Sequence, residues 1–336
     1  MTITARAFHL VSRPQGEPSE DNFRLVTSTL PDPGPGEIAV RNLAISVDPY
    51  MRGRMRDAES YAPPWQLDQP AQGGAVGEVV ASGSDQVPVG SLVVHNLGWR
   101  DYAVLPAEQA TVVPRQDGVS PTLYLGALGM TGRTAYVGLF RVAAFKPGDI
   151  VFVSGAAGAV GSMVGQFAKL SGARQVIGSA GSAAKIDYLR DVLGFDSVFD
   201  YHDGPAADLL AQAAPDGVDV FFDNVGGEQL EAAIGRMNLH GRIAICGSIS
   251  GYNKEEPDPG PRNLGLFISR RLTMTGFLVG DHSDLADEFT RTVGGWYASG
   301  RLVARETVVH GLENTPAAFI GMLKGDNTGK MIIKLD

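Results

Sequence analysis

The pattern of apolar and polar residues changes character near residue 125 of this chain. Before that residue, short apolar runs alternate with turn-forming glycine and proline, which is typical of β-strands in an irregular sheet. After it, apolar runs of strand length alternate with amphipathic segments of helical length. That alternation predicts right-handed βαβ crossovers and a parallel sheet. The sequence therefore predicts an α/β protein with two domains of different construction.

The N-terminal part is predicted to form a mostly β domain. Its strands are expected at residues 37–46, 75–80, 91–94 and 101–105. The tail from residue 303 to residue 335 returns to strand, helix (315–324) and strand. We therefore expect residues 1–124 and 300–336 to form one β-rich catalytic domain, into which the second domain is inserted.

The central part is predicted to form a doubly wound parallel sheet of the Rossmann type over residues 125–299. Its strands are expected at residues 150–154, 175–178, 197–200, 219–223, 242–247 and 272–277. Helices are expected at residues 159–171, 183–193, 228–237 and 284–299. Pockets often lie where two domains meet, so the substrate is expected there.

A glycine-rich turn follows the first strand of this central domain. The segment Ser154-Gly-Ala-Ala-Gly-Ala-Val-Gly161 joins an apolar strand to a helix of small residues. This order suits a dinucleotide pyrophosphate, because backbone N–H groups and the helix dipole at a helix start favour anions. Against the pattern G-x-G-x-x-G, the key positions are Ala156, Gly158 and Gly161. Gly158 leaves room for the pyrophosphate, whereas Gly161 and Gly165 allow close packing; an ordinary turn is the alternative.

The end of the second strand bears on the choice between NADPH and NADH. NAD-selective sites place a carboxylate there to bind the ribose 2′-hydroxyl. The segment Gly178-Ser-Ala-Gly181 has no acid, so a 2′-phosphate would meet no repulsion. Ser182 is a suitable N-cap for the next helix, and Lys185 falls in its first turn. A cation in the first turn is unfavourable against the helix dipole, but an anion bound between them would make it favourable. Lys185 therefore favours NADPH, which carries a 2′-phosphate. The alternative is that Lys185 is a solvated surface residue.

Composition and charge exclude several classes of function. The net charge of −9 gives no overall basic field to attract nucleic acid. The only cysteine is Cys246, so no disulfide framework is possible. No apolar run approaches the ~18 residues that span a bilayer, and no signal peptide is apparent, so we expect a cytoplasmic protein. The six histidines stand singly, and residues 72–78 carry none, so no zinc site is expected.

The lack of a metal points to a particular chemistry. Without a metal, a simple ketone or alcohol is hard to polarise. A conjugated C=C–C=O group is easier, because a hydride added to the β-carbon moves the charge to an enolate oxygen. One or two hydrogen-bond donors can stabilise that oxygen.

Several segments in a fixed order carry a family resemblance. They are Ser46-Val-Asp-Pro-Tyr-Met-Arg52, Gly129-Met-Thr-Gly132, Ala156-Ala-Gly-Ala-Val-Gly161, Phe222-Asp-Asn-Val-Gly-Gly227, Gly241-Arg-Ile-Ala-Ile-Cys-Gly247, Ser250-Gly-Tyr-Asn253 and Gly321-Met-Leu-Lys-Gly-Asp-Asn327. The chain resembles the zinc-independent medium-chain dehydrogenase/reductases. Within them it is similar to the leukotriene B4 dehydrogenase/prostaglandin reductase group, with its curcumin and double-bond reductases. The resemblance implies a GroES-like β-rich catalytic domain, a Rossmann domain, and NADPH-dependent reduction of the C=C bond of α,β-unsaturated ketones and aldehydes. It also implies a homodimer formed through the nucleotide-binding domain.

The resemblance further implies a set of cofactor-binding residues. They are Met130, Thr131, Ala157, Gly158, Ala159, Val160, Gly161, Ser179, Lys185, Tyr201, Asn224, Cys246, Gly247, Ile249 and Asn327. The backbone of residues 157–160 would hold the pyrophosphate. Lys185 and Tyr201 would contact the adenosine 2′-phosphate, and Met130 and Thr131 would line the nicotinamide. Packing in the core is the alternative for Met130, Tyr201 and Cys246.

Two tyrosines are candidates for the donor that stabilises the enolate. Tyr252 lies on a loop that continues into the proline-rich residues 255–261, and Tyr50 belongs to the β domain. Either ring could instead be a pocket wall, with the donor role passing to the cofactor ribose, and water could protonate the α-carbon. Residues 54–65 and 257–263 are expected to set the size of the pocket. An NADPH:quinone oxidoreductase and a non-catalytic NADPH-binding protein are the alternative functions.

Overall fold

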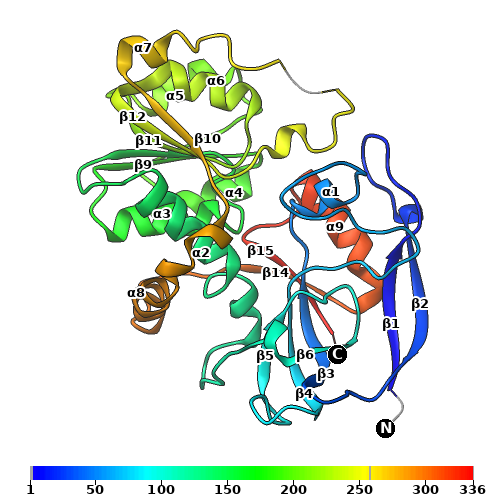
Figure 1. Ribbon diagram of the computed structural model, residues 1–336. Helices are drawn as coiled ribbons and strands as arrows, with labels where there is room; N and C mark the ends of the chain where they lie inside the picture. Colours follow the sequence, from blue (N-terminus) through cyan, green and yellow to red (C-terminus); the bar gives the residue numbers. More distant parts are fainter. Residues whose placement is uncertain (1–2, 257–258, 336) are drawn as a thin grey trace. The chain divides into compact units, whose positions relative to one another are not determined.

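The computed structural model describes residues 3–256 and 259–335 of the chain. It contains two compact units (Figure 1). The first unit comprises the chain up to Gly126 and again from Glu306, and the second comprises Ala127–Arg305. No helix in the described part of the chain is long and apolar enough to cross a membrane.

The first unit is built on a seven-stranded sheet with strand order β14-β15-β3-β4-β5-β7, in which β6 also pairs with β3. The strands are β3 (Glu37–Ser46), β4 (Ala75–Ser82), β5 (Leu92–His95), β6 (Tyr102–Pro106), β7 (Thr111–Val112), β14 (Glu306–His310) and β15 (Lys330–Lys334). The tail therefore completes this sheet, because β15 pairs antiparallel with β3.

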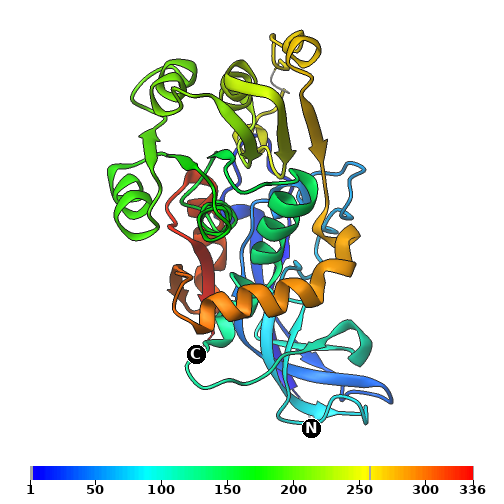
Figure 2. The same cartoon turned by 90° about the vertical axis from the view of Figure 1, so that its left-hand side faces the viewer.

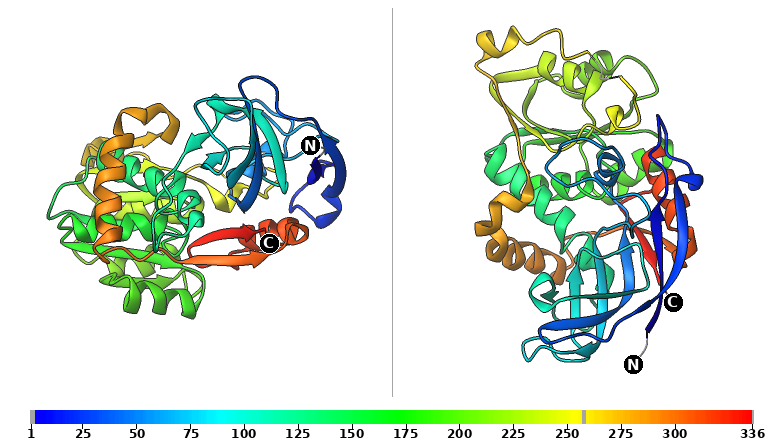
Figure 3. Two further views of the ribbon diagram at one scale, coloured as in Figure 1. Left: turned by 90° about the horizontal axis from the view of Figure 1, so that it is seen from below. Right: turned by 45° about the vertical axis from the view of Figure 1, so that its right-hand side comes forward.

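A second layer of the first unit was not predicted. Strands β1 (Ile3–Leu10) and β2 (Phe23–Leu30) form an antiparallel pair, seen in blue beside helix α9 (Thr315–Lys324) in Figure 3. Aromatic rings join these elements: Trp99 stacks on Phe23 at 5.0 Å between centroids, and Phe319 of α9 lies 5.6 Å from Trp99. The unit also contains the short helix α1 (Met51–Arg54).

The second unit contains a six-stranded sheet of strand order β10-β9-β8-β11-β12-β13. All the neighbouring strands pair in parallel. The strands are β8 (Ile150–Val153), β9 (Gln175–Ala180), β10 (Ser197–Asp200), β11 (Val218–Asp223), β12 (Met237–Ile245) and β13 (Thr273–Gly276). The prediction of a doubly wound parallel sheet is therefore confirmed.

Helices cover both faces of this sheet. They are α2 (Met130–Tyr136), α3 (Gly161–Leu170), α4 (Ala183–Asp187), α5 (Ala206–Ala213), α6 (Gly227–Arg236), α7 (Leu266–Arg270) and α8 (Ala286–Ala298). Val151 and Val153 of β8 share a buried cluster with side chains of α3 and α8. Ile150 and Phe152 point to the other face and pack with α5 and α6. Alternate residues of one strand thus face two helical layers, and α8 is the long orange helix in Figure 2.

Short helical segments connect these elements. The 3-10 segments are η1 (Glu20–Asn22), η2 (Ala107–Gln109), η3 (Pro121–Leu125), η6 (Ile249–Gly251), η7 (Val279–Leu285) and η8 (Leu312–Asn314). The π-helical segments η4 (Val137–Val142) and η5 (Tyr188–Val192) extend α2 and α4. The helix predicted over residues 183–193 is therefore α-helical only as far as Asp187.

Strand β12 is longer than the prediction of residues 242–247. It begins at Met237, where a helix was expected to end. The early part of the strand is irregular, because its register against β11 shifts and His240 has a positive φ of 63°. Leu239 is 55% exposed there, so the usual pattern of buried alternate residues is absent. This irregularity explains why the sequence pattern located only the second half of the strand.

Candidate functional site

The glycine-rich turn lies at the carboxyl end of β8 and leads directly into α3. Gly155 adopts a left-handed φ of 58°, which favours glycine. A Cβ atom on Gly161 would lie 2.5 Å from the carbonyl oxygen of Gly155, so glycine is required for this close approach. A Cβ on Gly158 would meet only that same oxygen, at 3.3 Å, and would otherwise fill open space. The turn thus has the open cradle at a helix start that a pyrophosphate requires.

Helix α3 packs closely on the sheet because two glycines face one ring. A Cβ on Gly165 would lie 2.0 Å from the Phe195 ring, and one on Gly178 would lie 2.8 Å from it. Phe195 itself is buried. The ring therefore packs between α3 and β9 at positions where neither element carries a side chain.

The turns after β8 and β11 are joined directly. Asn224 donates a hydrogen bond from Nδ2 to the carbonyl oxygen of Ser154 at 2.8 Å. The Ser154 hydroxyl accepts the backbone N–H of Asn224 at 2.9 Å and donates to Oδ1 of Asp223 at 2.8 Å. The predicted residue Asn224 is therefore held beside the glycine-rich turn.

The turn after β12 joins the same group. The backbone N–H of Ile249 donates to the carbonyl oxygen of Asn224 at 3.2 Å. Gly226 has a φ of 73°, and a Cβ there would lie 2.6 Å from Oγ of Ser248. The structure thus brings together Asn224, Gly247 and Ile249, for which the family resemblance implies contacts with one cofactor.

Cys246 is held as a neutral thiol. Burial, together with the neighbouring Asp223 carboxyl, raises the pKa of Cys246 to about 12. Its backbone N–H donates to the carbonyl oxygen of Asp223 at 2.8 Å. A thiol that keeps its proton is a poor nucleophile, so covalent catalysis by Cys246 is not favoured, and its contact with a cofactor stays a prediction.

A second region of the site lies at the carboxyl ends of β9 and β10. The Tyr201 ring covers Gly181, where a Cβ would lie 2.5 Å from the phenol oxygen. Tyr201 is 43% exposed, which does not fit the alternative of a core residue. Lys185 lies in the first turn of α4, as predicted, and Ser182 occupies the N-cap position without a capping bond from its side chain. Glycine at position 181 is therefore what allows the phenol to reach this corner.

Ser179 has a different environment from the other predicted cofactor residues. Its side chain is fully buried, and its hydroxyl donates to Oε1 of Gln229 at 2.6 Å. The structure therefore uses this hydroxyl to join β9 to α6 and does not present it at the surface of the site.

Tyr252 follows η6 and lies against the end of β12. Its phenol oxygen accepts the backbone N–H of Ser248 at 3.3 Å, and a Cβ on Gly247 would lie 3.4 Å from that oxygen. Burial raises the pKa of the Tyr252 phenol, so the hydroxyl keeps its proton at neutral pH. Residues 257 and 258 of the following loop lie outside the described part of the chain.

Met130 and Thr131 form the start of α2. Met130 is 39% exposed, so the alternative of core packing does not describe it. Thr131 is 3% exposed, and its hydroxyl has no hydrogen-bond partner among the described residues. A buried hydroxyl without a partner is suited to a ligand.

Two predicted residues belong to the first unit. Tyr50 is partly buried against the core at the N-cap position of α1, and burial strongly raises the pKa of its phenol. Asn327 donates from Nδ2 to the carbonyl oxygen of Gly329 at 2.7 Å. Their approach to a cofactor stays a prediction.

The residues of the second unit fit a bound dinucleotide phosphate. The cradle at Gly158, the joined turns at Asn224 and Ile249, and the corner with Lys185 and Tyr201 all lie at carboxyl ends of parallel strands. Ligands bind at this edge in doubly wound sheets. Ser154 and Asp223 were not predicted as site residues, although each is a polar residue at the end of an apolar run.

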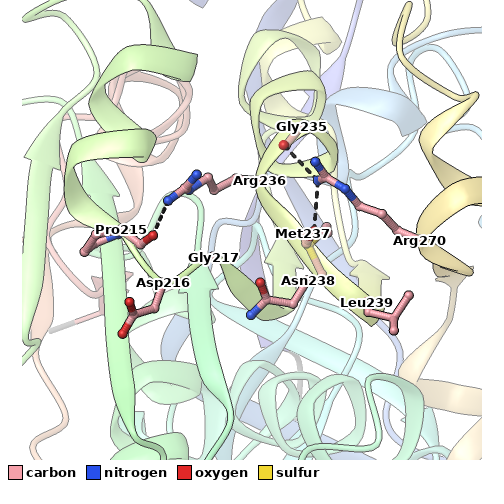
Figure 4. A pocket seen from close by; sticks show the side chains of 9 residues that line it. All are labelled: Pro215, Asp216, Gly217, Gly235, Arg236, Met237, Asn238, Leu239 and Arg270. Carbon is pink, nitrogen blue, oxygen red and sulfur yellow. Dashed lines mark hydrogen bonds between the residues drawn. The ribbon is translucent and has the colours of Figure 1, made fainter.

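A polar pocket of about 450 Å³ lies elsewhere in the second unit (Figure 4). It is lined by Pro215, Asp216, Gly217, Gly235, Arg236, Met237, Asn238, Leu239 and Arg270. Arg236 donates to the carbonyl oxygen of Pro215, and Arg270 donates to those of Gly235 and Met237. These bonds satisfy carbonyl groups at or just after the carboxyl ends of α5 and α6. The pocket lies at the amino end of β12 and is distinct from the cofactor edge.

No group of three or more histidine, cysteine, aspartate or glutamate side chains within residues 3–256 and 259–335 is arranged to hold a metal ion. His95, for example, is buried and bonds to Oδ1 of Asn42 at 2.9 Å. Metal independence stays a prediction for experiment.

Comparisons with known proteins place the chain among oxidoreductases. Residues 6–113 match the family described as the N-terminal domain of oxidoreductase, and residues 159–293 match the family described as zinc-binding dehydrogenase. The chain is 45% identical to a putative NADP-dependent oxidoreductase of Bacillus subtilis over 100% of this chain and 99% of the relative. It is 39% identical to the NADPH-dependent curcumin reductase of Escherichia coli, over 98% and 96% of the two chains.

A plant enzyme and a solved structure extend the comparison. The NADP-dependent 2-alkenal reductase of Nicotiana tabacum is 41% identical over 95% of this chain and 94% of the relative. The crystal structure of CurA from Vibrio vulnificus in complex with NADPH is 41% identical, with a TM-score of 0.94 over 98% of this chain and 99% of that one. Such identity over almost the whole length, on a matching two-unit fold, shows that this chain belongs to the zinc-independent medium-chain dehydrogenase/reductases.

Proposed function

We propose that the protein uses NADPH to reduce the C=C bond of α,β-unsaturated ketones and aldehydes. The observation that carries this proposal is the group of turns at one sheet edge, where the Gly158 cradle, Asn224 and the Tyr252 loop lie together. The relatives named for curcumin and 2-alkenal reduction support the same substrate class, because both substrates are conjugated carbonyl compounds.

The second unit supplies the groups that bind the cofactor. Backbone N–H groups of residues 157–160 bind the pyrophosphate at the start of α3. Lys185 and Tyr201 bind the 2′-phosphate, which selects NADPH over NADH. When bound, NADPH supplies the hydride for the reaction.

The chain stabilises the charge that develops on the substrate. As the β-carbon of the substrate gains hydride, its carbonyl oxygen gains negative charge. The Tyr252 hydroxyl donates a hydrogen bond to that oxygen. It can do so because burial raises the pKa of the phenol, so that the hydroxyl keeps its proton. Tyr50 is the second donor candidate, from the first unit, and water protonates the α-carbon.

The test is a steady-state assay that follows the loss of NADPH with an enone, with a quinone, and with neither. We expect fast oxidation with the enone and a product in which the carbonyl is kept and the C=C bond is saturated. An allylic alcohol as product, or turnover of the quinone alone, would contradict the proposal. NADPH binding without turnover of either compound would support a non-catalytic binding protein.

We also propose that two copies of the chain pair through β13. This strand lies at the edge of the six-stranded sheet, and all of its residues, Thr273–Gly276, are exposed. Met274 is 41% exposed on it, and Ile268 of the preceding helix is 83% exposed. An exposed edge strand presents unpaired backbone groups to another strand, and a second copy offers the same edge.

Light scattering tests this pairing. We expect the mass of a dimer for the wild-type chain at micromolar concentration and the mass of a monomer for Thr275→Pro, since proline cannot donate to a strand ladder. A wild-type monomer would exclude the homodimer.

A cytoplasmic location is also part of the proposal. It is supported by the single cysteine, Cys246, which can form no internal disulfide that would require an oxidising compartment.

A further inference from the structure

Strand β11 carries an aspartate near each of its ends. At the amino end, Asp219 accepts the backbone N–H of Ile150 at 2.9 Å and Nδ2 of Asn238 at 2.9 Å. At the carboxyl end, Asp223 is fully buried. Both carboxyl groups therefore bridge β11 to a neighbouring strand, one at the amino ends of the strands and the other at their carboxyl ends.

Oδ1 of Asp223 accepts three hydrogen bonds. The donors are the Ser154 hydroxyl at 2.8 Å, the Val225 N–H at 2.9 Å and the Gly226 N–H at 2.9 Å. One carboxyl oxygen thus closes the turn that follows β11 and joins it to the turn that follows β8. The Ser154 hydroxyl also accepts the Asn224 N–H, and the Ser154 carbonyl oxygen accepts Nδ2 of Asn224, so three hydrogen bonds join the two turns.

The backbone of Asp223 extends this connection to the third strand. Its carbonyl oxygen accepts the N–H of Cys246 at 2.8 Å and that of Gly247 at 3.0 Å. A single residue is therefore bonded to the ends of β8, β11 and β12, from which most of the candidate cofactor edge is formed.

The environment of the second oxygen of this carboxyl group indicates that an aspartate at position 223 does not serve stability alone. Oδ2 of Asp223 is buried and has no hydrogen-bond partner among the described residues. Burying a carboxyl group with half of its acceptors unused is unfavourable for folding. Buried polar atoms almost always have a hydrogen-bond partner, so this oxygen calls for an explanation other than stability.

We propose that Asp223 is a positioning residue for NADPH: its buried carboxyl group, with the Ser154 hydroxyl, holds the turns after β8 and β11 in the one arrangement that the cofactor binds. The inference rests on the cofactor site proposed above. Asp223 touches no ligand itself and acts through the backbone of residues 155–158 and 224–226.

Four variants test the proposal, with Asp219→Ala as the matched control from the other end of the strand. The NADPH dissociation constant is measured by the change in cofactor fluorescence, and the melting temperature of each cofactor-free variant is measured alongside. Asp223→Ala should weaken NADPH binding about tenfold or more, since it removes the acceptor that three donors share. Ser154→Ala should weaken it about three- to tenfold.

The remaining variants separate positioning from stability. Asp223→Asn should bind NADPH within about threefold of the wild type, because the amide keeps an acceptor at Oδ1 and places its NH₂ group at Oδ2. Asp219→Ala should lower the melting temperature yet leave NADPH affinity within about twofold, because its bonds lie at the opposite edge of the sheet.

The outcomes are distinct. Unchanged NADPH affinity in both Asp223→Ala and Ser154→Ala overturns the inference, as does an equal loss of affinity in Asp219→Ala. If Asp223→Ala does not fold, the other two variants still test the inference. It then requires that Ser154→Ala binds NADPH more weakly than the wild type and that Asp223→Asn keeps its NADPH affinity. A wild-type protein that does not bind NADPH would instead contradict the proposed cofactor site.

Discussion

Nζ of Lys330 lies 2.9 Å from Oδ1 of Asp48 and 2.9 Å from the carbonyl oxygen of Val47, inside the first unit. Both side chains are almost fully buried, with 4% and 5% of their surface exposed. Oδ2 of Asp48 accepts the Ser46 hydroxyl. The tail strand β15 is thus joined by a buried ion pair to the segment that carries Tyr50.

Removing the lysine should destabilise the first unit. Lys330→Met leaves the Asp48 carboxylate buried without its cation, so the free energy of unfolding should fall by about 3–5 kcal/mol. Denaturant unfolding monitored by circular dichroism measures this. The double variant Lys330→Met, Asp48→Asn should recover part of the loss, because no net charge is then buried. A loss below about 1 kcal/mol in the single variant would show that the pair contributes little.

His95 should make stability depend on pH. Leu97 donates its N–H to Nδ1 of His95, so the proton lies on Nε2 and is donated to Oδ1 of Asn42. Burial, with a smaller effect from Arg100, lowers the pKa of His95 from 6.5 to about 4. The unfolded chain therefore binds a proton below pH 6.5 that the folded chain does not, and about 3 kcal/mol of stability is lost as the pH falls from 6.5 to 4.

The variant His95→Gln tests this dependence. It should be less stable than the wild type at neutral pH, yet its unfolding free energy should change less between pH 6.5 and 4, the two pKa values of the folded and unfolded histidine. Parallel pH profiles for the two proteins would assign the acid sensitivity to other groups.

Lys185 should decide the preference for NADPH. Lys185→Ala removes a charge-assisted contact to the 2′-phosphate, so KM for NADPH should rise about tenfold while KM for NADH hardly changes. Lys169→Ala is the matched control, because that lysine pairs with Asp196 at 2.7 Å near the end of α3. Equal NADPH affinity in the Lys185 variant and the wild type would remove this residue from the site.

Tyr252→Phe should lower kcat for enone reduction more than it changes NADPH binding. Loss of the main donor to a developing oxyanion costs ~10²–10³-fold in rate, and about tenfold if the cofactor ribose shares the charge. Tyr50→Phe should instead raise KM for the enone with kcat nearly kept. Single-turnover hydride transfer from deuterated NADPH discriminates the two. A wild-type rate in Tyr252→Phe, with a clear isotope effect, would leave this ring as a pocket wall.

Enone reduction should survive metal removal. The part of the chain that the structure describes offers no cluster of metal-ligating side chains. Activity after dialysis against EDTA or a stronger chelator should equal that of untreated enzyme. Stoichiometric zinc in elemental analysis, with a content that tracks activity, would overturn the assignment of a metal-free mechanism.

Elements with clear end signals were predictable from the sequence. Helix α9 matches the predicted residues, Thr315–Lys324, because Pro316 lies at its start and Gly325 ends it in a left-handed conformation. Strand β3 likewise matches the predicted residues, Glu37–Ser46. The pair β1 and β2 was missed, because most of the residues of β2 are exposed or half-buried and give no apolar run.

The connections within the site could not be predicted, because they join residues that are distant in the sequence. Ser154 and Asp223 are 69 positions apart, and their bond depends on β8 and β11 being neighbours in the sheet. Local patterns give the strands but not their order. The glycine-rich turn, in contrast, has a local sequence signal in residues 154–161, although its placement depends on the bonds to Asp223 and Asn224.

The packing of Phe195 limits which substitutions this protein can accept during evolution. Its ring fills the hollow left by the missing side chains of both Gly165 and Gly178. An alanine at either glycine is compatible with the fold only after the ring has become smaller, and a smaller ring alone opens a void beneath α3. Positions 165, 178 and 195 should therefore co-vary among homologues: a larger residue at either glycine should appear together with a smaller residue at 195.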